Sequence, residues 1–160
     1  MAPLLQELAI KVSDTLQKQH LKLATAESCT GGGLGYWLTN ISGSSKWFEC
    51  GFITYSDSAK VRMLGVNPLT IKAYGAVSAE AAREMAEGAL KNSEADISIA
   101  ITGIAGPTGG TTLKPIGTVW IGWAKRGGKP DAHLAICSGD REAIRTQAME
   151  KALMKLVEIV

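Results

Sequence analysis

A chain of 160 residues, 46% hydrophobic and 20% charged, has the size and apolar content of one globular domain, so we expect a single domain over 1–160. The net charge is +2 and both signs are mixed along the chain, which excludes an extended nucleic-acid-binding stripe or an acidic tail. Three widely spaced cysteines, no signal peptide and no apolar run of membrane-spanning length predict a cytoplasmic protein without nucleic-acid or membrane partners.

The chain begins with a helix and a short buried strand. Apolar residues recur every three or four positions behind Pro3, which predicts an amphipathic helix to about Gln19. The apolar run over 21–26 predicts a strand, and helical spacing resumes over about 32–40.

The segment between that strand and helix is the first candidate site. It contains Ser28 and Thr30, followed by three consecutive glycines at 31–33. A strand, a tight turn and a helix start bring hydroxyl groups and free backbone N–H groups together, and glycines let a ligand approach the main chain. The alternative is that Ser28 or Thr30 is only the N-cap of the helix, although a cap does not require three glycines.

The middle of the chain is mainly helical. The segment WFECGFITY at 47–55 predicts a strand, with Gly51 at a bulge or a close approach. After it we expect three helices. The first is capped by Ser56 or Asp57, runs through Met63 and is closed by Gly65. The second is capped by Asn67 and runs from Pro68 toward Tyr74, and the third is capped by Ser78 and runs from Ala79 to about Asn92.

The last third carries three further strands and a long helix. A strand over 96–102 ends in a glycine-rich loop at 103–110, strands over 117–124 and 132–136 form a hairpin, and a helix runs from about Asp140 to the end. This order predicts a single-domain α/β/α sandwich with a mixed, mainly parallel sheet and a late antiparallel hairpin. Two strands that both end in loops of Gly and Thr predict a ligand site at one sheet edge.

The common catalytic motifs are absent. The sequence has no dinucleotide fingerprint, no P-loop, no G-x-S-x-G elbow and no zinc-binding H-E-x-x-H, so we expect no cofactor and no bound metal. His20 and His133 lack a neighbouring catalytic pattern, and we interpret both as structural or surface residues. A serine nucleophile would then need another base, and lysine serves if burial lowers its pKa.

Tyr55 and Lys60 are the candidates for that base and its partner. They lie across a predicted strand end and helix start, and they would converge with Ser28 if the first two strands are neighbours. The alternative is a core tyrosine and a solvated lysine.

Arg141 and Arg145 lie one turn apart at the start of the last predicted helix. A helix N-terminus already attracts anions, so two arginines there suit a phosphate or a carboxylate of a ligand. An ion pair with Asp140 or Glu142 is an equally good interpretation.

Several long segments together resemble the CinA C-terminal domain family, in the same order and over nearly the whole chain. They are TAESCTGG at 25–32, GSSKWFECGFITYSDSAK at 43–60, YGAVS at 74–78, ITGIAGPTGGTTLKPIGTVW at 101–120 and SGDR at 138–141. The resemblance implies hydrolysis of the carboxamide of nicotinamide mononucleotide to nicotinate mononucleotide and ammonia.

The resemblance also implies residue roles. Ser28 becomes the candidate nucleophile, with Tyr55 and Lys60 as its acid-base partners. The expected substrate-binding residues are Thr30, Gly31, Gly32, Ser45, Thr102, Gly103, Gly106, Arg141 and Arg145. Backbone N–H groups around 30–32 or 103–106 would hold the oxyanion.

Two rival interpretations stay open. One is a non-catalytic nucleotide-binding or regulatory module, and the other is an amidase for a different small amide. We further expect a homo-oligomer, although the sequence does not give its size.

Overall fold

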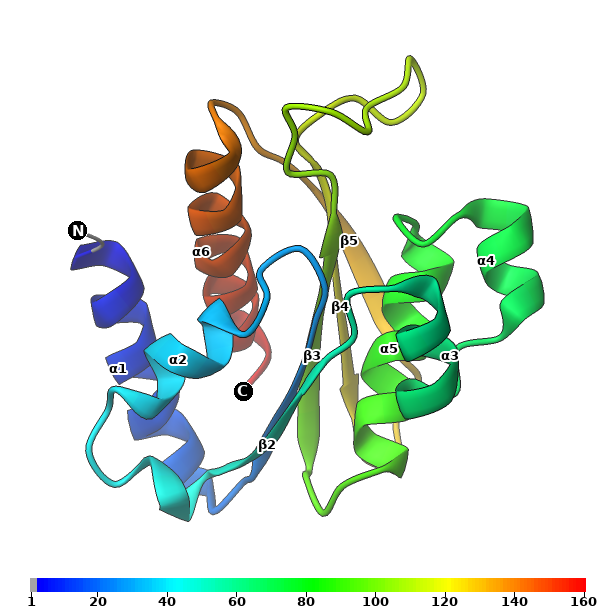
Figure 1. The fold of residues 1–160 in the computed structure, drawn as a ribbon. Helices are drawn as coiled ribbons and strands as arrows, with labels where there is room; N and C mark the ends of the chain where they lie inside the picture. The colour runs from blue at the N-terminus through cyan, green and yellow to red at the C-terminus, as the bar shows by residue number, and fades with distance from the viewer. Residues whose placement is uncertain (1–2) are drawn as a thin grey trace.

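The computed structural model describes residues 3–160 and contains a five-stranded mixed sheet with helices on both faces (Figure 1). The first two residues of the expected 1–160 domain lie outside that range. In the order β2-β1-β3-β4-β5 the strands are Phe48–Ile53, Leu23–Glu27, Ile97–Gly103, Thr118–Lys125 and Asp131–Ile136. β2, β1 and β3 are parallel, whereas β4 and β5 pair antiparallel. The predicted α/β class, mixed sheet and late hairpin are confirmed.

The helices cover the sheet in two layers. One face packs against α1 (Pro3–Gln19), α2 (Gly33–Thr39) and α6 (Arg141–Ile159), and the other carries α3 (Asp57–Leu64), α4 (Pro68–Tyr74) and α5 (Ala79–Lys91) (Figure 1). A short 3-10 turn, η1 (Ser44–Lys46), precedes β2. Each face therefore has its own apolar core, and burial of this surface supplies the main driving force for folding.

The predicted helix caps are present. Ser56, Asn67 and Ser78 accept a backbone N–H at the starts of α3, α4 and α5, and Asp140 does so for α6. Gly65 closes α3 with a left-handed backbone, φ 69°. These local signals explain why the helix boundaries agree with the sequence.

The first two strands differ slightly from prediction. β1 begins at Leu23 rather than at 21 and includes Glu27, whose carboxylate is satisfied inside the protein. β2 is shorter than the predicted 47–55, and its register shifts opposite Leu23 and Ala24. Gly51 provides a close approach, since a Cβ there would lie 2.8 Å from Thr25 Oγ1.

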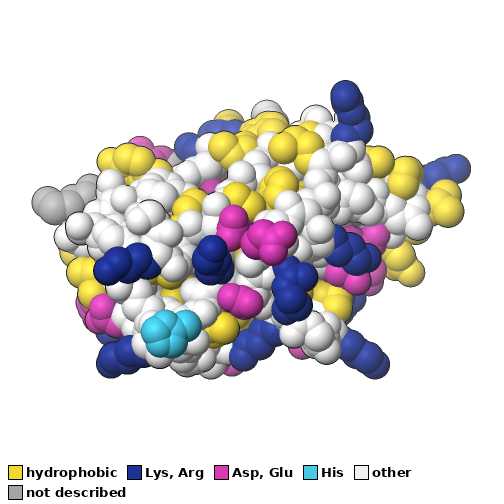
Figure 2. Space-filling view, turned by 90° about the horizontal axis from the view of Figure 1, so that it is seen from below, with side chains coloured by type: hydrophobic (Ala, Val, Ile, Leu, Met, Phe, Trp, Pro, Cys, Tyr) yellow, Lys and Arg dark blue, Asp and Glu magenta, His cyan; other side chains and the backbone are white. Residues whose placement is uncertain are grey.

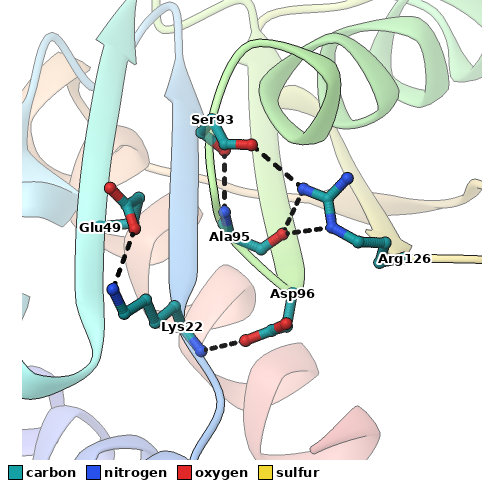
Figure 3. A network of polar contacts seen from close by, with 6 residues as sticks. All are labelled: Lys22, Glu49, Ser93, Ala95, Asp96 and Arg126. Atoms are coloured by element: carbon teal, nitrogen blue, oxygen red, sulfur yellow. Dashed lines mark hydrogen bonds and ion pairs between the residues drawn. The ribbon is translucent and has the colours of Figure 1, made fainter.

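A polar network closes the end of the sheet where β1 and β3 begin (Figure 3). The Lys22 backbone N–H donates to the Asp96 carboxylate at 2.8 Å, and Arg126 Nε donates to the Ala95 carbonyl at 2.9 Å. Figure 2, which views the molecule from below, shows acidic and basic side chains interspersed on that face. Within residues 3–160, no helix is both long and apolar enough to traverse a bilayer.

Candidate active site

A cavity of about 270 Å³ opens beyond the carboxyl ends of β1 and β3, at the opposite end of the sheet from the network in Figure 3. Parallel pairing of β2, β1 and β3 brings the loops that follow these strands to one edge, as predicted for a ligand site. Seven of the predicted site residues line it: Ser28, Tyr55, Lys60, Thr102, Gly103, Gly106 and Arg141.

Lys60 lies on the first turns of α3 and points inward. Only 1% of its surface is exposed, so the alternative of a solvated charge is not what the structure has. Its Nζ lies 2.9 Å from Ser28 Oγ, and it donates to the backbone carbonyls of Thr54 at 2.9 Å and Tyr55 at 3.1 Å. Three acceptors surround a group that has three hydrogens when charged. An uncharged amine has two hydrogens for the two carbonyls and a lone pair that would accept the Ser28 hydroxyl hydrogen.

Burial adjusts the acidity of the groups around Ser28. Removal of the Lys60 amine from water lowers its pKa below the usual 10.5, and the nearby Asp57 carboxylate partly opposes this. Burial also raises the pKa of the Cys29 thiol, next in the chain, to about 11. Cys29 therefore stays protonated near neutral pH, so a competing thiolate nucleophile is not available there.

Tyr55 and Arg141 form one wall of the cavity. Tyr55 is 59% exposed, so it is not the core residue of the alternative interpretation. Arg141 donates through Nη2 to the Tyr55 hydroxyl at 3.0 Å and through Nη1 to the Gly106 carbonyl at 2.7 Å. Lys60 contacts Ser28 directly, so the structure has no Tyr55 hydroxyl between these two atoms, and the expected acid-base role of Tyr55 stays a prediction. Tyr55 contributes its carbonyl to the lysine and its hydroxyl to the wall.

Thr102 and the loop that follows it form another part of the cavity wall. The Thr102 hydroxyl is buried and donates to the Ala76 carbonyl at 2.8 Å, which ties the loop before α5 to β3. Gly103 closely approaches the neighbouring strand, since a Cβ there would lie 2.8 Å from Val119 Cγ2. Further along the loop, Gly106, Thr108 and Gly109 also line the cavity.

The turn after Ser28 is held in a way that the sequence did not reveal. The N-cap of α2 is Gly32 and it makes no side-chain cap bond, so neither Ser28 nor Thr30 is that cap. Instead the buried Glu27 carboxylate accepts from the Thr30 hydroxyl at 2.6 Å and from the backbone N–H groups of Leu34 at 2.9 Å and Gly35 at 3.1 Å. The sequence signal that could have indicated this contact is the position of Glu27, an acidic residue at the end of an apolar strand and just before a helix N-terminus, where a negative charge is stabilised.

Five predicted binding residues lie outside the cavity lining. Thr30, Gly31 and Gly32 form the turn below it, where both glycines have left-handed backbones, with φ of 60° and 95°. Ser45 lies in η1, just before Phe48, which pairs with Leu23 at the start of β1. Ser45 is therefore at the end of the sheet away from the cavity. The structure does not bring Ser45 to Ser28 within this chain.

Arg145 is the fifth of these residues. Its Nε donates to the Cys29 carbonyl at 3.0 Å and its Nη2 to the Thr30 carbonyl at 3.2 Å. Within residues 3–160, neither Arg145 nor Arg141 forms an ion pair with Asp140 or Glu142, and the Asp140 carboxylate caps α6 instead. Of the two arginines, only Arg141 faces the cavity.

Some cavity residues escaped the sequence analysis. Asp57, Thr108 and Gly109 line the cavity, and the apolar wall includes Val77 and Ile104. Only the proximity of Asp57 to Lys60 in the motif could have indicated its influence on the lysine. His20 and His133 are exposed and do not line the cavity. Across residues 3–160, no group of three or more His, Cys, Asp or Glu side chains is arranged to hold a metal ion.

Sequence comparisons identify relatives over almost the full chain. A family model described as "CinA C-terminal domain" matches residues 5–160. The nicotinamide-nucleotide amidohydrolase PncC of Escherichia coli K12 is 47% identical over 152 residues, which cover 95% of this chain and 92% of that protein. A CinA-like protein of Akkermansia muciniphila is 46% identical over 158 residues, or 99% of this chain but 38% of that longer protein.

Solved structures share the fold. The crystal structure of the competence/damage inducible protein CihA from Agrobacterium tumefaciens aligns with a TM-score of 0.93 at 40% identity and covers 97% of this chain and 94% of that one. A CinA superfamily protein from Escherichia coli aligns with a TM-score of 0.93 at 38% identity, over 98% of this chain and 90% of that one.

Proposed function

We propose that this chain, which belongs to the CinA C-terminal domain family, is an amidase that hydrolyses the carboxamide of nicotinamide mononucleotide to nicotinate mononucleotide and ammonia. The observation that carries the proposal is the 2.9 Å contact between Lys60 Nζ and Ser28 Oγ inside the cavity. The name of the E. coli relative supports the substrate, and we take residues 1–160 as one amidohydrolase domain. Cytoplasmic location and homo-oligomeric assembly stay predictions from the sequence.

Attack begins with transfer of the Ser28 proton. Uncharged Lys60 accepts that proton while the carbonyls of Thr54 and Tyr55 hold the amine in place. Ser28 Oγ then bonds to the carboxamide carbon, and the C=O electron pair moves to oxygen. Burial supports this role of Lys60, because it lowers the pKa of the lysine and increases the uncharged fraction at a given pH.

Release of ammonia reverses the proton transfer. Protonated Lys60 gives its proton to the amide nitrogen as the C–N bond breaks, which leaves an acyl ester on Ser28 and free ammonia. Water, deprotonated by the same amine, then attacks the ester, and Ser28 recovers its proton as the carboxylate leaves. Backbone N–H groups at 29–32 or 103–106 would donate to the oxyanion in both steps.

Arg141 is our candidate for the phosphate group. It faces the cavity, and its guanidinium has more N–H groups than the two that contact Gly106 and Tyr55. The apolar wall of Val77 and Ile104 offers a surface for the pyridine ring. No step of this scheme uses a metal.

The test is an ammonia-release assay with nicotinamide mononucleotide, with and without a chelator, together with identification of the product by mass. We expect equal turnover with and without the chelator. We also expect the mass of the product to show that the amide NH2 has been replaced by OH. Binding without ammonia release would indicate the non-catalytic module, and faster turnover of a small amide without ribose phosphate would indicate the other amidase. Loss of turnover with the chelator would contradict the metal-free scheme.

A further inference from the structure

The turn that carries Ser28 is contacted by two charged side chains on different elements. From α6, the Arg145 guanidinium reaches the carbonyls of Cys29 at 3.0 Å and Thr30 at 3.2 Å. From the end of β1, the buried Glu27 carboxylate accepts from the Thr30 hydroxyl at 2.6 Å. Thr30 is thus held through its side chain by the acid and through its backbone by the arginine.

The turn needs such restraint because its own backbone is permissive. Gly31 and Gly32 have positive φ angles, so their conformational freedom in the absence of contacts is large. Two backbone hydrogen bonds close it, from the Gly31 N–H to the Ser28 carbonyl and from the Gly33 N–H to the Thr30 carbonyl, both at 3.0 Å. Charge-assisted hydrogen bonds are about twice as strong as neutral ones, so the two charged groups add substantial restraint to these backbone bonds.

We propose that Arg145 is a positioning residue, which together with Glu27 holds the Ser28 turn so that Oγ stays within reach of Lys60. The inference rests on the proposed function, since it concerns the placement of the nucleophile of that reaction. It assigns to Arg145 a role different from phosphate binding.

Arg145 also orients a backbone donor. In a trans peptide the C=O and the N–H point in opposite directions, so an arginine that holds the Cys29 carbonyl directs the Thr30 N–H away from itself. Among residues 3–160, that N–H finds no acceptor. The same guanidinium therefore restrains the direction of an N–H group two residues from the proposed nucleophile, and this group is one of the candidate oxyanion donors.

Phosphate binding by Arg145 is less consistent with the structure. Its side chain is absent from the cavity lining, and it already donates to two carbonyls. Departure toward a ligand would remove the arginine from the Cys29 carbonyl and leave the Thr30 carbonyl with only the Gly33 N–H, which opposes such a movement.

Kinetics with two substrates separate the roles. For Arg145→Ala we expect kcat to fall about 10²-fold with KM little changed, both for nicotinamide mononucleotide and for the phosphate-free nicotinamide riboside, since a misplacement near 1 Å has effects of this size. Arg145→Lys should recover only part of kcat, because the single ammonium nitrogen of lysine replaces the two guanidinium nitrogens that contact the Cys29 and Thr30 carbonyls. Lys151→Ala is the matched control: it removes one positive charge from an exposed position on the same helix, and its kcat should equal that of the wild type.

A raised KM for the nucleotide alone, with kcat intact, would overturn the inference and return Arg145 to the phosphate. Because Arg145→Ala could lose its fold, melting temperatures accompany the kinetics, and Arg145→Lys serves as the folded comparison.

Labelling of Ser28 by a small fluorophosphonate, followed by mass spectrometry, tests the turn without the natural substrate. We expect Arg145→Ala and Glu27→Gln to be labelled at least tenfold more slowly than wild type and Lys151→Ala. A wild type that is labelled but releases no ammonia would contradict the proposed substrate while the slower labelling of the variants still supports the turn. Equal labelling rates in all variants would contradict the inference while the amidase stands, and an unlabelled wild type would overturn both.

Discussion

The Lys60 amine lies 2.9 Å from the Ser28 hydroxyl oxygen, although the two residues are 32 positions apart in the chain. Ser28 follows β1, and Lys60 lies on α3, the helix after the neighbouring parallel strand β2. Parallel pairing brings both to one end of the sheet, and burial of the amine lowers its pKa, as the proposed base requires.

Removal of the nucleophile should abolish turnover without loss of the fold. Ser28→Ala is expected to lower kcat by about 10³-fold or more, because no other group can form the acyl intermediate. Ser58→Ala, at an exposed position on α3, is the matched control and should keep wild-type kcat. Ammonia release and circular dichroism measure the two effects. Near-normal turnover in Ser28→Ala would favour direct attack by water.

The pH dependence should report Lys60. The amine acts as a base only when uncharged, so log kcat/KM should rise with pH and level off above the pKa of Lys60, which burial places below 10.5. Asp57 raises that pKa, and Asp57→Asn should therefore shift the rising limb to lower pH.

Asp131→Asn, on the exposed edge strand β5, makes the same substitution away from the cavity and should leave the profile unchanged. A limb that shifts upward in Asp57→Asn, or that persists in Lys60→Met, would show that another group titrates.

Arg141 should determine the preference for a phosphorylated substrate. We expect Arg141→Ala to raise KM for nicotinamide mononucleotide about 10- to 100-fold, the equivalent of about 1.5–3 kcal/mol for a hydrogen-bonded charged group. KM for nicotinamide riboside should hardly change, which controls for the lost contacts to Tyr55 and Gly106. An equal rise for both substrates would mean that Arg141 shapes the cavity without binding phosphate.

Gly88 should be essential for the placement of α3. A Cβ on Gly88 would lie 1.9 Å from the carbonyl oxygen of Leu64, the last residue of the helix that carries Lys60. We expect Gly88→Ala to lower the free energy of unfolding by about 1–3 kcal/mol and to reduce kcat, because α3 must move away from α5.

Gly128→Ala is the comparison, since the nearest atom to its Cβ, the Lys125 carbonyl oxygen, lies at 3.4 Å in an exposed turn. Its melting temperature should stay within a few degrees of wild type. Unchanged stability in Gly88→Ala would mean that the two helices separate at little cost.

The sequence was sufficient for the elements because their signals are local. Apolar periodicity indicated α1 and α6, and cap residues such as Ser78 and Asp140 marked helix starts that the structure confirms. The alternation of helices and strands was sufficient for the α/β class, and the motif order was sufficient for the family.

The arrangement of the site required the tertiary structure, because it depends on burial and on contacts between distant segments. Whether Lys60 is solvated or buried depends on how α3 packs on the sheet. The separation of Ser45 from the cavity follows from the direction of β2, and the different partners of Arg141 and Arg145 follow from the placement of α6 against the Ser28 turn. Residue types and spacings therefore determined which groups are present, whereas only packing decided which of them meet and in which direction burial shifts their pKa values.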